Sequence, residues 1–236
     1  MKLHICRTAV CALALTAALL SLTGCQQLPG LMIPPDSSQP AASQPTEQTE
    51  GASGPLAPPR WLPGEIFDLT IEGSTLKFRI VDQEAKDLYV IYGQPAPTGA
   101  LVVPTSVTKD GITFTVSLVY EAAFMGREDL TSVTIQDSPG EVTTIGGATF
   151  KDCTGLEKVT LSNQVTAIRP YAFVSCTNLK SIYIPTSVTH LEENPFDGAD
   201  QLTIYYQGSQ EDWEKIHGYE SVTRPVRFLA KPEDMP

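Results

Sequence analysis

The sequence predicts a mostly β protein, a short solenoid of about four units of roughly 23 residues each. Phenylalanines recur 26, 23 and 23 residues apart, at Phe124, Phe150, Phe173 and Phe196. Six residues after each ring comes a leucine, at Leu130, Leu156, Leu179 and Leu202. Five residues before each ring comes a branched aliphatic residue, at Val119, Ile145, Ile168 and Leu191. A period in the low twenties is typical of solenoids, whose units bury their apolar faces only against neighbours. We therefore expect the rings and leucines to form one stacked apolar spine.

Each unit is expected to hold two short extended segments. Nine and eleven residues after a ring, apolar residues alternate with polar ones, as at Val159 and Leu161. Such alternation predicts a strand with one buried face. The β-branched content between Val165 and Ile168 favours a second extended segment. The Ala-Phe-x-x-Cys phrase must reverse the chain within a few residues, so we expect a tight helical turn there.

The run over residues 172–191, which begins Ala-Phe-x-x-Cys-x-x-Leu, resembles the bacterial leucine-rich repeat of the BspA-like, or treponemal, type. The resemblance extends over roughly residues 100–229. It implies a short right-handed leucine-rich-repeat solenoid. It also implies a cell-surface role, because the family consists largely of surface proteins of bacteria and some protists, some of them adhesins for host matrix proteins. The chain departs from the family pattern in its small number of units and in having Arg127 and Ala199 in place of the repeat cysteine at either end.

Residues 1–24 are predicted to be a lipoprotein signal peptide. Lys2 and Arg7 provide a positive start, and the apolar stretch 9–22 is too short for a comfortable membrane span. The stretch leads into Leu-Thr-Gly-Cys25, which looks like a bacterial lipobox. We therefore expect cleavage before Cys25, lipidation of that residue, and an exported protein that is lipid-anchored to the bacterial cell membrane and exposed at the cell surface. A plain secretory signal peptide is the alternative.

Residues 25–63 are expected to comprise the lipidated Cys25 and a disordered tether rich in Pro, Ser and Gln. Residues 26–60 contain eight prolines among 35 residues and almost no large apolar side chains after Ile33. Such a stretch cannot bury enough surface to offset the entropy of ordering it. A tether of this kind suits a module that must stand clear of the bilayer.

Residues 64–107 are expected to form a β-rich cap over the first repeat, whose apolar edge would otherwise be exposed. Alternating runs at 66–71 and 76–80 predict two strands, and further strands are expected at 88–92 and 100–103.

The repeats are expected over residues 108–207, followed by a C-terminal cap and tail at 208–236. A run at 209–212 resembles a capping box and predicts a short helix through His217, with Trp213 facing inward. A last short strand is expected after that helix.

Charge and motifs argue against several classes of function. The net charge is −11, and removing residues 1–24 with their two basic residues leaves 14 Lys and Arg against 27 Asp and Glu, or −13. Nucleic-acid recognition needs a basic footprint, so it is not expected. The sequence has no Gly-x-Ser-x-Gly, phosphate-binding glycine loop, His-Glu-x-x-His or Cys-x-x-Cys motif. We expect no catalysis, no cofactor and no metal, and interpret His190 and His217 as surface residues.

Two cysteines occupy equivalent places in neighbouring units, Cys153 and Cys176. Stacked units bring equivalent residues within disulfide range, but their side chains point the same way. This favours two buried thiols over a disulfide.

The candidate binding face is the outward side of the main strands, eight and ten residues after each ring. It comprises Ser132, Thr134, Lys158, Thr160, Ser181, Tyr183, Thr203 and Tyr205, the last pair in a unit shortened by one residue. The stripe is polar, uncharged apart from Lys158, and gains tyrosine toward the C-terminus. Tyrosine provides wide contact area at low entropy cost, although Thr and Tyr are also simply good strand formers.

These observations predict a non-catalytic, lipid-anchored surface module that binds a protein ligand in the manner of an adhesin. The partner would be a host matrix protein or an envelope protein. One alternative is a structural envelope-associated lipoprotein that contacts the cell's own proteins. Another is a glycan-binding module in which Tyr183 and Tyr205 stack on sugar rings.

Overall fold

The computed structural model describes residues 62–82, 84–93, 96–137 and 143–236. The signal peptide, Cys25 and almost all of the tether lie outside these residues. Within the described part, no helix has the length and apolar character needed to cross a membrane.

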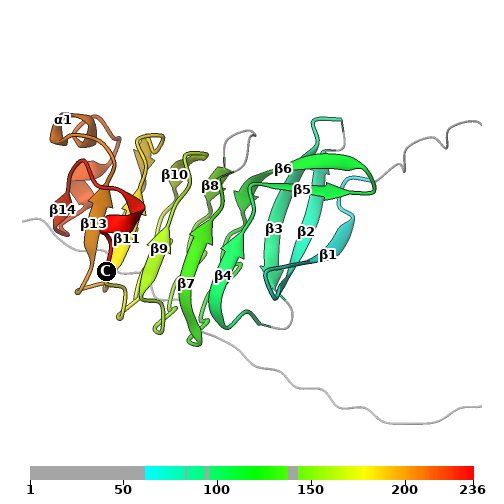
Figure 1. The fold of residues 1–236 in the computed structure, drawn as a ribbon, viewed down its shortest axis with the longest axis horizontal. Helices are drawn as coiled ribbons and strands as arrows, with labels where there is room; N and C mark the ends of the chain where they lie inside the picture. The colour runs from blue at the N-terminus through cyan, green and yellow to red at the C-terminus, as the bar shows by residue number, and fades with distance from the viewer. Residues whose placement is uncertain (1–61, 83, 94–95, 138–142) are drawn as a thin grey trace, which may run out of the picture. The chain divides into compact units, whose positions relative to one another are not determined.

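The strands of the described residues form two sheets (Figure 1). The front sheet has six strands, in the order β14 (Val226–Arg227), β13 (Thr203–Tyr206), β11 (Ser181–Ile184), β9 (Lys158–Thr160), β7 (Leu130–Ile135) and β4 (Gly99–Val103). The back sheet has eight, in the order β1 (Ile66–Ile71), β2 (Ser74–Asp82), β3 (Asp87–Gly93), β6 (Ile112–Val119), β8 (Thr143–Ile145), β10 (Val165–Ile168) and β12 (His190–Leu191), with β5 (Ser106–Lys109) paired to β6.

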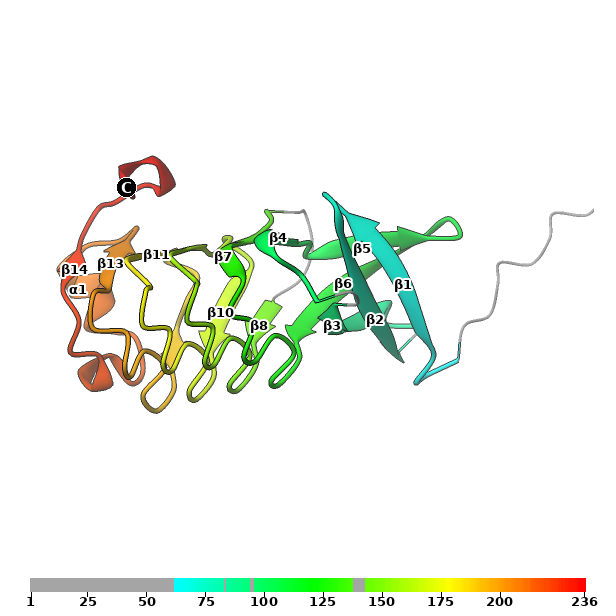
Figure 2. The ribbon, with the colours of Figure 1, turned by 90° about the horizontal axis from the view of Figure 1, so that it is seen from below.

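From β6 to β13 the chain alternates between the two sheets, with one strand in each per unit (Figure 2). Strands of successive units pair in parallel, as β9 does with β11 in the front sheet and β8 with β10 in the back sheet. This arrangement confirms the predicted mostly β solenoid with two extended segments per unit.

The four phenylalanine rings lie in one column in the core, each in the turn that leads from a back-sheet strand to the next front-sheet strand. Neighbouring ring centroids are 5.4, 5.3 and 5.8 Å apart, with interplanar angles of 9°, 10° and 17°. Each ring is at most 3% exposed, and the four leucines that follow them are at most 1% exposed. Regular spacing of identical residues in sequence thus becomes a stack of identical side chains in space.

The turn around each ring differs from the expected helical turn. The residues two before and two after each ring have left-handed backbone angles, for example Ala148 (φ 51°) and Asp152 (φ 60°) around Phe150. Left-handed residues on both sides of the ring prevent a right-handed helix. Their amides instead donate to the next unit, Ala148 N to Pro170 O at 3.0 Å and Asp152 N to Val174 O at 2.9 Å.

The two cysteines confirm the preference for buried free thiols. The Cys153 thiol donates to the Phe124 carbonyl at 3.1 Å, and the Cys176 thiol donates to the Phe150 carbonyl at 3.1 Å. Burial raises the pKa of Cys153 to about 11 and raises that of Cys176 as well. Each thiol therefore ties its unit to the preceding one, and neither has the lowered pKa of a nucleophile.

The N-terminal cap consists of the antiparallel strands β1, β2 and β3, which extend the back sheet through a parallel pairing of β3 with β6. The strand expected at 100–103 is not part of this cap. It is β4, which pairs in parallel with β7 and is the first strand of the front sheet. No phenylalanine precedes β4 at the repeat spacing, so the sequence pattern did not identify it as part of the solenoid.

The C-terminal cap begins with the helix α1 (Gln210–Trp213), whose capping box forms as predicted between Ser209 and Asp212. The helix is one turn long and does not reach His217. Trp213 is 5% exposed and packs edge-on against Tyr206, with ring centroids 5.1 Å apart. Two short 3₁₀ helices follow, η1 (Tyr219–Ser221) and η2 (Pro232–Asp234).

Candidate protein-binding face

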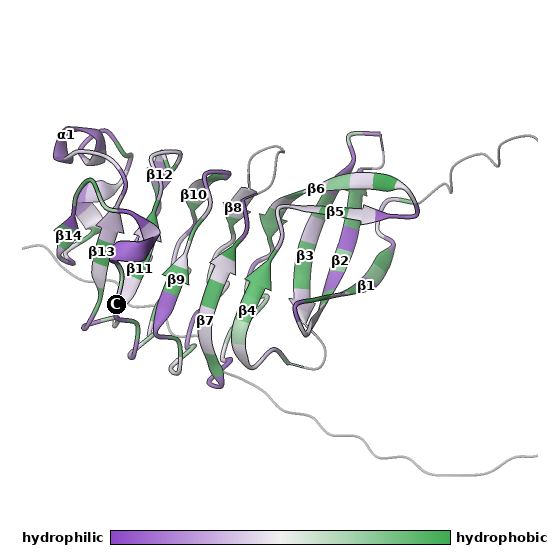
Figure 3. Cartoon of the chain, in the orientation of Figure 1, coloured by the Kyte–Doolittle hydropathy of each residue, from purple (hydrophilic) through white to green (hydrophobic). Residues whose placement is uncertain are grey.

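The front sheet places the candidate side chains in two rows across its outer side. The parallel pairings align Ser132, Lys158, Ser181 and Thr203 in one row and Thr134, Thr160, Tyr183 and Tyr205 in the other. The residues between them point inward and are buried, as Val159 and Ile182 are. Figure 3 shows the resulting alternation as bands of contrasting hydropathy along the strands.

The N-terminal half of this face is accessible. Ser132 and Thr134 on β7, together with Lys158 and Thr160 on β9, are half-buried. This is the usual state of a side chain that stands on a sheet next to its in-register neighbours. These four residues form a continuous polar patch that can donate and accept hydrogen bonds.

Three of the four residues in the C-terminal half of the face are buried, which corrects the expectation that Tyr183 and Tyr205 are exposed. Both tyrosines are only 5% exposed and Ser181 is 1% exposed, whereas Thr203 is half-buried. The tyrosines form a separate apolar cluster with Ala230 and Met235. Alternation correctly gave the direction of these side chains, but it carries no information about a distant segment that folds back over them.

The covering segment, residues 229–236, is here named the strap. It leaves the front sheet after β14 and crosses the outer side of β13 and β11 (Figures 1 and 2). The backbone amides of its first two residues donate hydrogen bonds to earlier residues of the chain. Leu229 N donates to Gly208 O at 2.9 Å, and Ala230 N donates to Tyr206 O at 3.0 Å. From there it runs through η2, in which the Asp234 carboxylate accepts from Lys231 N at 2.7 Å.

Lys158 is the charged residue of the face and reaches the far end of the strap. Its ammonium donates to backbone oxygens of Met235 at 3.4 Å and Pro236 at 3.2 Å. These acceptors are backbone atoms, so the contact does not depend on a particular side chain of the strap.

Further charges surround the tyrosines. The Arg227 guanidinium lies over the Tyr205 ring, 5.5 Å from its centroid. Burial raises the pKa of Tyr183, and the nearby carboxylates of Asp137 and Glu233 raise it further. The rings of Tyr183 and Tyr205 therefore pack against the apolar strap residues and have charged side chains nearby.

Sequence reasoning missed Ala230 and Met235, the two strap residues that are buried. The available signal was small. Met235 is the one large apolar side chain between Lys231 and Pro236, in an otherwise polar stretch. A lone methionine has no periodic partner, so no pattern marked it as a contact.

The structure also brings together His190 and His217, which are far apart in sequence. Their rings are 5.6 Å apart and both residues are exposed, in keeping with the surface interpretation. Over the described residues, no group of three or more His, Cys, Asp or Glu is placed to hold a metal ion.

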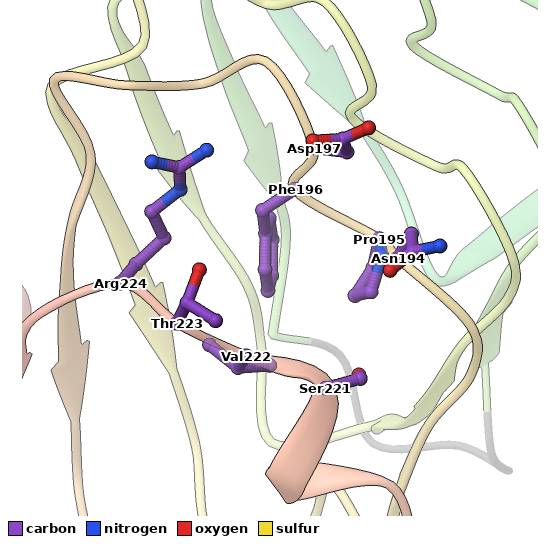
Figure 4. Close-up of a pocket in the computed structure, with 8 residues that line it drawn as sticks. All are labelled: Asn194, Pro195, Phe196, Asp197, Ser221, Val222, Thr223 and Arg224. Carbon is purple, nitrogen blue, oxygen red and sulfur yellow. The ribbon is translucent and has the colours of Figure 1, made fainter.

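A separate cavity of about 210 Å³ lies beside the last ring of the phenylalanine column, lined by residues 194–197 and 221–224. Figure 4 shows the Phe196 ring in its middle, with Thr223 and Arg224 on one side and Pro195 on the other. Arg224 is bound to Asp200 by an ion pair of 2.9 Å. None of the predicted face residues lines this cavity.

Comparison with known proteins supports the repeat assignment. A family model described as a BspA-type leucine-rich repeat region matches residues 105–216 in six copies. A leucine-rich repeat protein from Bacteroides capillosus ATCC 29799 is 32% identical, with a TM-score of 0.50, over 60% of this chain and 99% of that one. A leucine-rich repeat protein of T. pallidum is 23% identical, with a TM-score of 0.48, over 64% of this chain and 61% of that one. No curated protein matched.

The matched region 105–216 contains the whole phenylalanine column and both rows of the face. The Bacteroides capillosus protein is matched along almost its entire length at 32% identity. The chain is thus a repeat-based interaction module and belongs to the bacterial leucine-rich repeat proteins of the BspA type.

Proposed function

We propose that this chain is a non-catalytic surface module that binds a protein ligand through the outer side of its front sheet and is held at the bacterial membrane by a lipid on Cys25. The observation that carries the proposal is the polar patch of Ser132, Thr134, Lys158 and Thr160. Four half-buried side chains stand there in register on strands of a repeat scaffold.

A rigid, in-register patch suits protein binding for a physical reason. Parallel strands of successive units lie about 4.8 Å apart, so the side chains stand at a spacing that extended peptide backbone can match. The stacked phenylalanine rings hold successive units, and therefore their strands, at that spacing. Little conformational entropy then remains to be lost when a ligand docks, which is the general benefit of preorganisation.

Glycan binding by stacking is less well supported. It would require open faces on Tyr183 and Tyr205, and both rings lie under the strap. A hydrogen-bonding contact with protein needs only the patch that is already accessible.

The binding face is tested with a double substitution, Thr134→Arg with Thr160→Arg. We expect it to weaken binding at least tenfold, about 1.4 kcal/mol, because two bulky charged side chains would stand in the middle of the patch. The chain from residue 26 onward is immobilised, proteins are captured from host matrix and bacterial envelope fractions, and the affinity of each captured protein is measured for both forms.

The matched control is Thr144→Arg with Thr166→Arg, on β8 and β10 of the back sheet, where both threonines are equally half-buried. This variant should bind as the unsubstituted chain does. If it loses the ligand while the front-sheet variant keeps it, the binding surface is not the front sheet.

The membrane anchor is tested by Cys25→Ser. Without the thiol no diacylglyceryl group can be attached, so we expect the protein to leave the membrane fraction or to persist as an uncleaved precursor. Fractionation and metabolic labelling with a fatty acid measure this. Wild-type protein that takes up no fatty acid and fractionates as freely soluble would refute the anchor.

A further inference from the structure

The strap covers the part of the front-sheet face that carries Tyr183 and Tyr205, and it lies there as a bound peptide would. We propose that the surface under the strap is a peptide-binding site, and that its ligand is a short segment of another protein with the strap's chemistry. That chemistry is an unbranched apolar side chain, as Met235 has, in a segment whose backbone oxygens can accept from Lys158. This inference rests on the proposed function, since it names the class of partner that the front sheet accepts.

The first support is how the strap is held. Only Ala230 and Met235 of residues 230–236 are buried, whereas Lys231, Pro232, Glu233, Asp234 and Pro236 are all exposed. The strap thus touches the face at two apolar points with an exposed turn between them. A segment with two anchors on a preformed surface is the pattern of a docked peptide rather than of a core element.

The second support is the chemistry of the surface beneath. Tyr183 and Tyr205 form an adjacent pair of amphipathic rings in register, which is the type of residue that concentrates binding energy at interfaces. Methionine is the side chain best able to fit such a surface, because it is unbranched and polarisable.

The third support is polar. Lys158 binds two backbone oxygens of the strap, so this contact depends on no side chain of the segment bound there. Its charge and that of Arg227, over Tyr205, lie at the two ends of the tyrosine pair. The polar contacts of the strap with the face thus depend on its backbone, because Glu233 and Asp234 are exposed and pair with Lys231 within the strap.

In this arrangement the strap competes with the ligand. Its effective concentration at the face is high because it is joined to β14 by the chain, so a partner must displace it. The affinity measured for a partner is then reduced by the fraction of molecules in which the strap is open.

The experiment uses the full processed chain and a synthetic peptide with the strap's own sequence, residues 229–236. Met235→Asp replaces the buried anchor by a charge and should release the strap. We expect this variant to bind the peptide at least tenfold more tightly than the unsubstituted chain does. The matched control is Met125→Asp, at a methionine that is 48% exposed and distant in sequence from the strap, and it should bind the peptide as weakly as the unsubstituted chain does.

Accessibility of the rings gives a second readout that does not depend on the peptide. Nitration of tyrosines, located by mass spectrometry, should be slow at Tyr183 and Tyr205 in the unsubstituted chain and at least several-fold faster in Met235→Asp. Tyr171, which is 44% exposed, should react equally in both and serves as the internal reference.

Two results would overturn the inference. One is a folded Met235→Asp variant that binds the peptide no better than the unsubstituted chain does. The other is an unsubstituted chain in which Tyr183 and Tyr205 react as fast as Tyr171. If either occurs while Thr134→Arg with Thr160→Arg still abolishes partner binding, the proposed function stands without the strap site. If the peptide binds but that double variant keeps its partner, the strap site stands and the polar patch does not.

Discussion

Replacing Phe173 by Ala is expected to lower the free energy of unfolding by about 3 to 5 kcal/mol, the usual cost of deleting a large buried aromatic side chain. Phe173 is fully buried and is stacked between Phe150, at 5.3 Å, and Phe196, at 5.8 Å. Its removal leaves a cavity in the middle of the column. It also removes one stacking partner from each of the two neighbouring rings. Urea unfolding followed by circular dichroism measures the loss.

The position within the array makes this loss severe. A repeat protein is stabilised by contacts between nearest neighbours, so a break in the middle separates two short halves. Small proteins have about 5 to 15 kcal/mol of stability in total, and the predicted loss is a large share of that.

Tyr171→Ala is the matched control, an aromatic deletion in the same turn. Tyr171 is 44% exposed, and its left-handed conformation is already adopted by alanine at the equivalent positions Ala122 and Ala148. Its effect should stay within about 0.5 kcal/mol. Equal melting curves for Phe173→Ala and the unsubstituted chain would mean that the column does not carry the stability of the array.

The same column links stability to binding. The front-sheet patch has its geometry only while successive units remain stacked, because Thr134 and Thr160 belong to different units. Phe173→Ala should therefore weaken ligand binding through loss of structure, whereas Thr134→Arg with Thr160→Arg should weaken it in a folded protein. Comparing melting curves separates these two causes.

The period of the sequence predicted the column and the register of the face because both follow from interactions between equivalent residues. Once the rings are spaced by 23 residues, stacking units in register places Thr160 beside Tyr183. Each unit repeats the same local pattern, so one sequence motif determines many contacts at once.

The features that the sequence did not predict depend on single, non-repeating events. The strap lies on Tyr183 and Tyr205 because Ala230 and Met235 return to them from a distant part of the chain. The left-handed turns were also hidden, since Ala148 and Asp152 hold the conformation without being glycine. Their strain is offset by hydrogen bonds to the next unit, which are visible only once the units are stacked.

Gly155→Ala is expected to destabilise the fold by about 3 kcal/mol, at the upper end of the usual cost of overpacking. A Cβ atom at residue 155 would lie 1.9 Å from the carbonyl oxygen of Glu128 in the preceding unit, and 3.3 Å from that of Leu130. Both neighbours are backbone atoms, so no side chain can rotate away and the two turns must separate. That separation would pull the Phe124 ring away from the Phe150 ring; their centroids are 5.4 Å apart in the native fold.

Asn178 occupies the position equivalent to Gly155 in the next unit, and it is exposed. Asn178→Ala therefore makes the same final residue at a site that already accommodates a Cβ atom, and its effect should stay within about 0.5 kcal/mol. Urea unfolding of the two variants isolates the cost of the close approach. If Gly155→Ala unfolds at the same urea concentration as Asn178→Ala, then the turns have room to move apart and their spacing is not set by this glycine. A loss confined to Gly155→Ala would show that the first full repeat is held to the second by direct contact of their backbones, and that only glycine permits this contact.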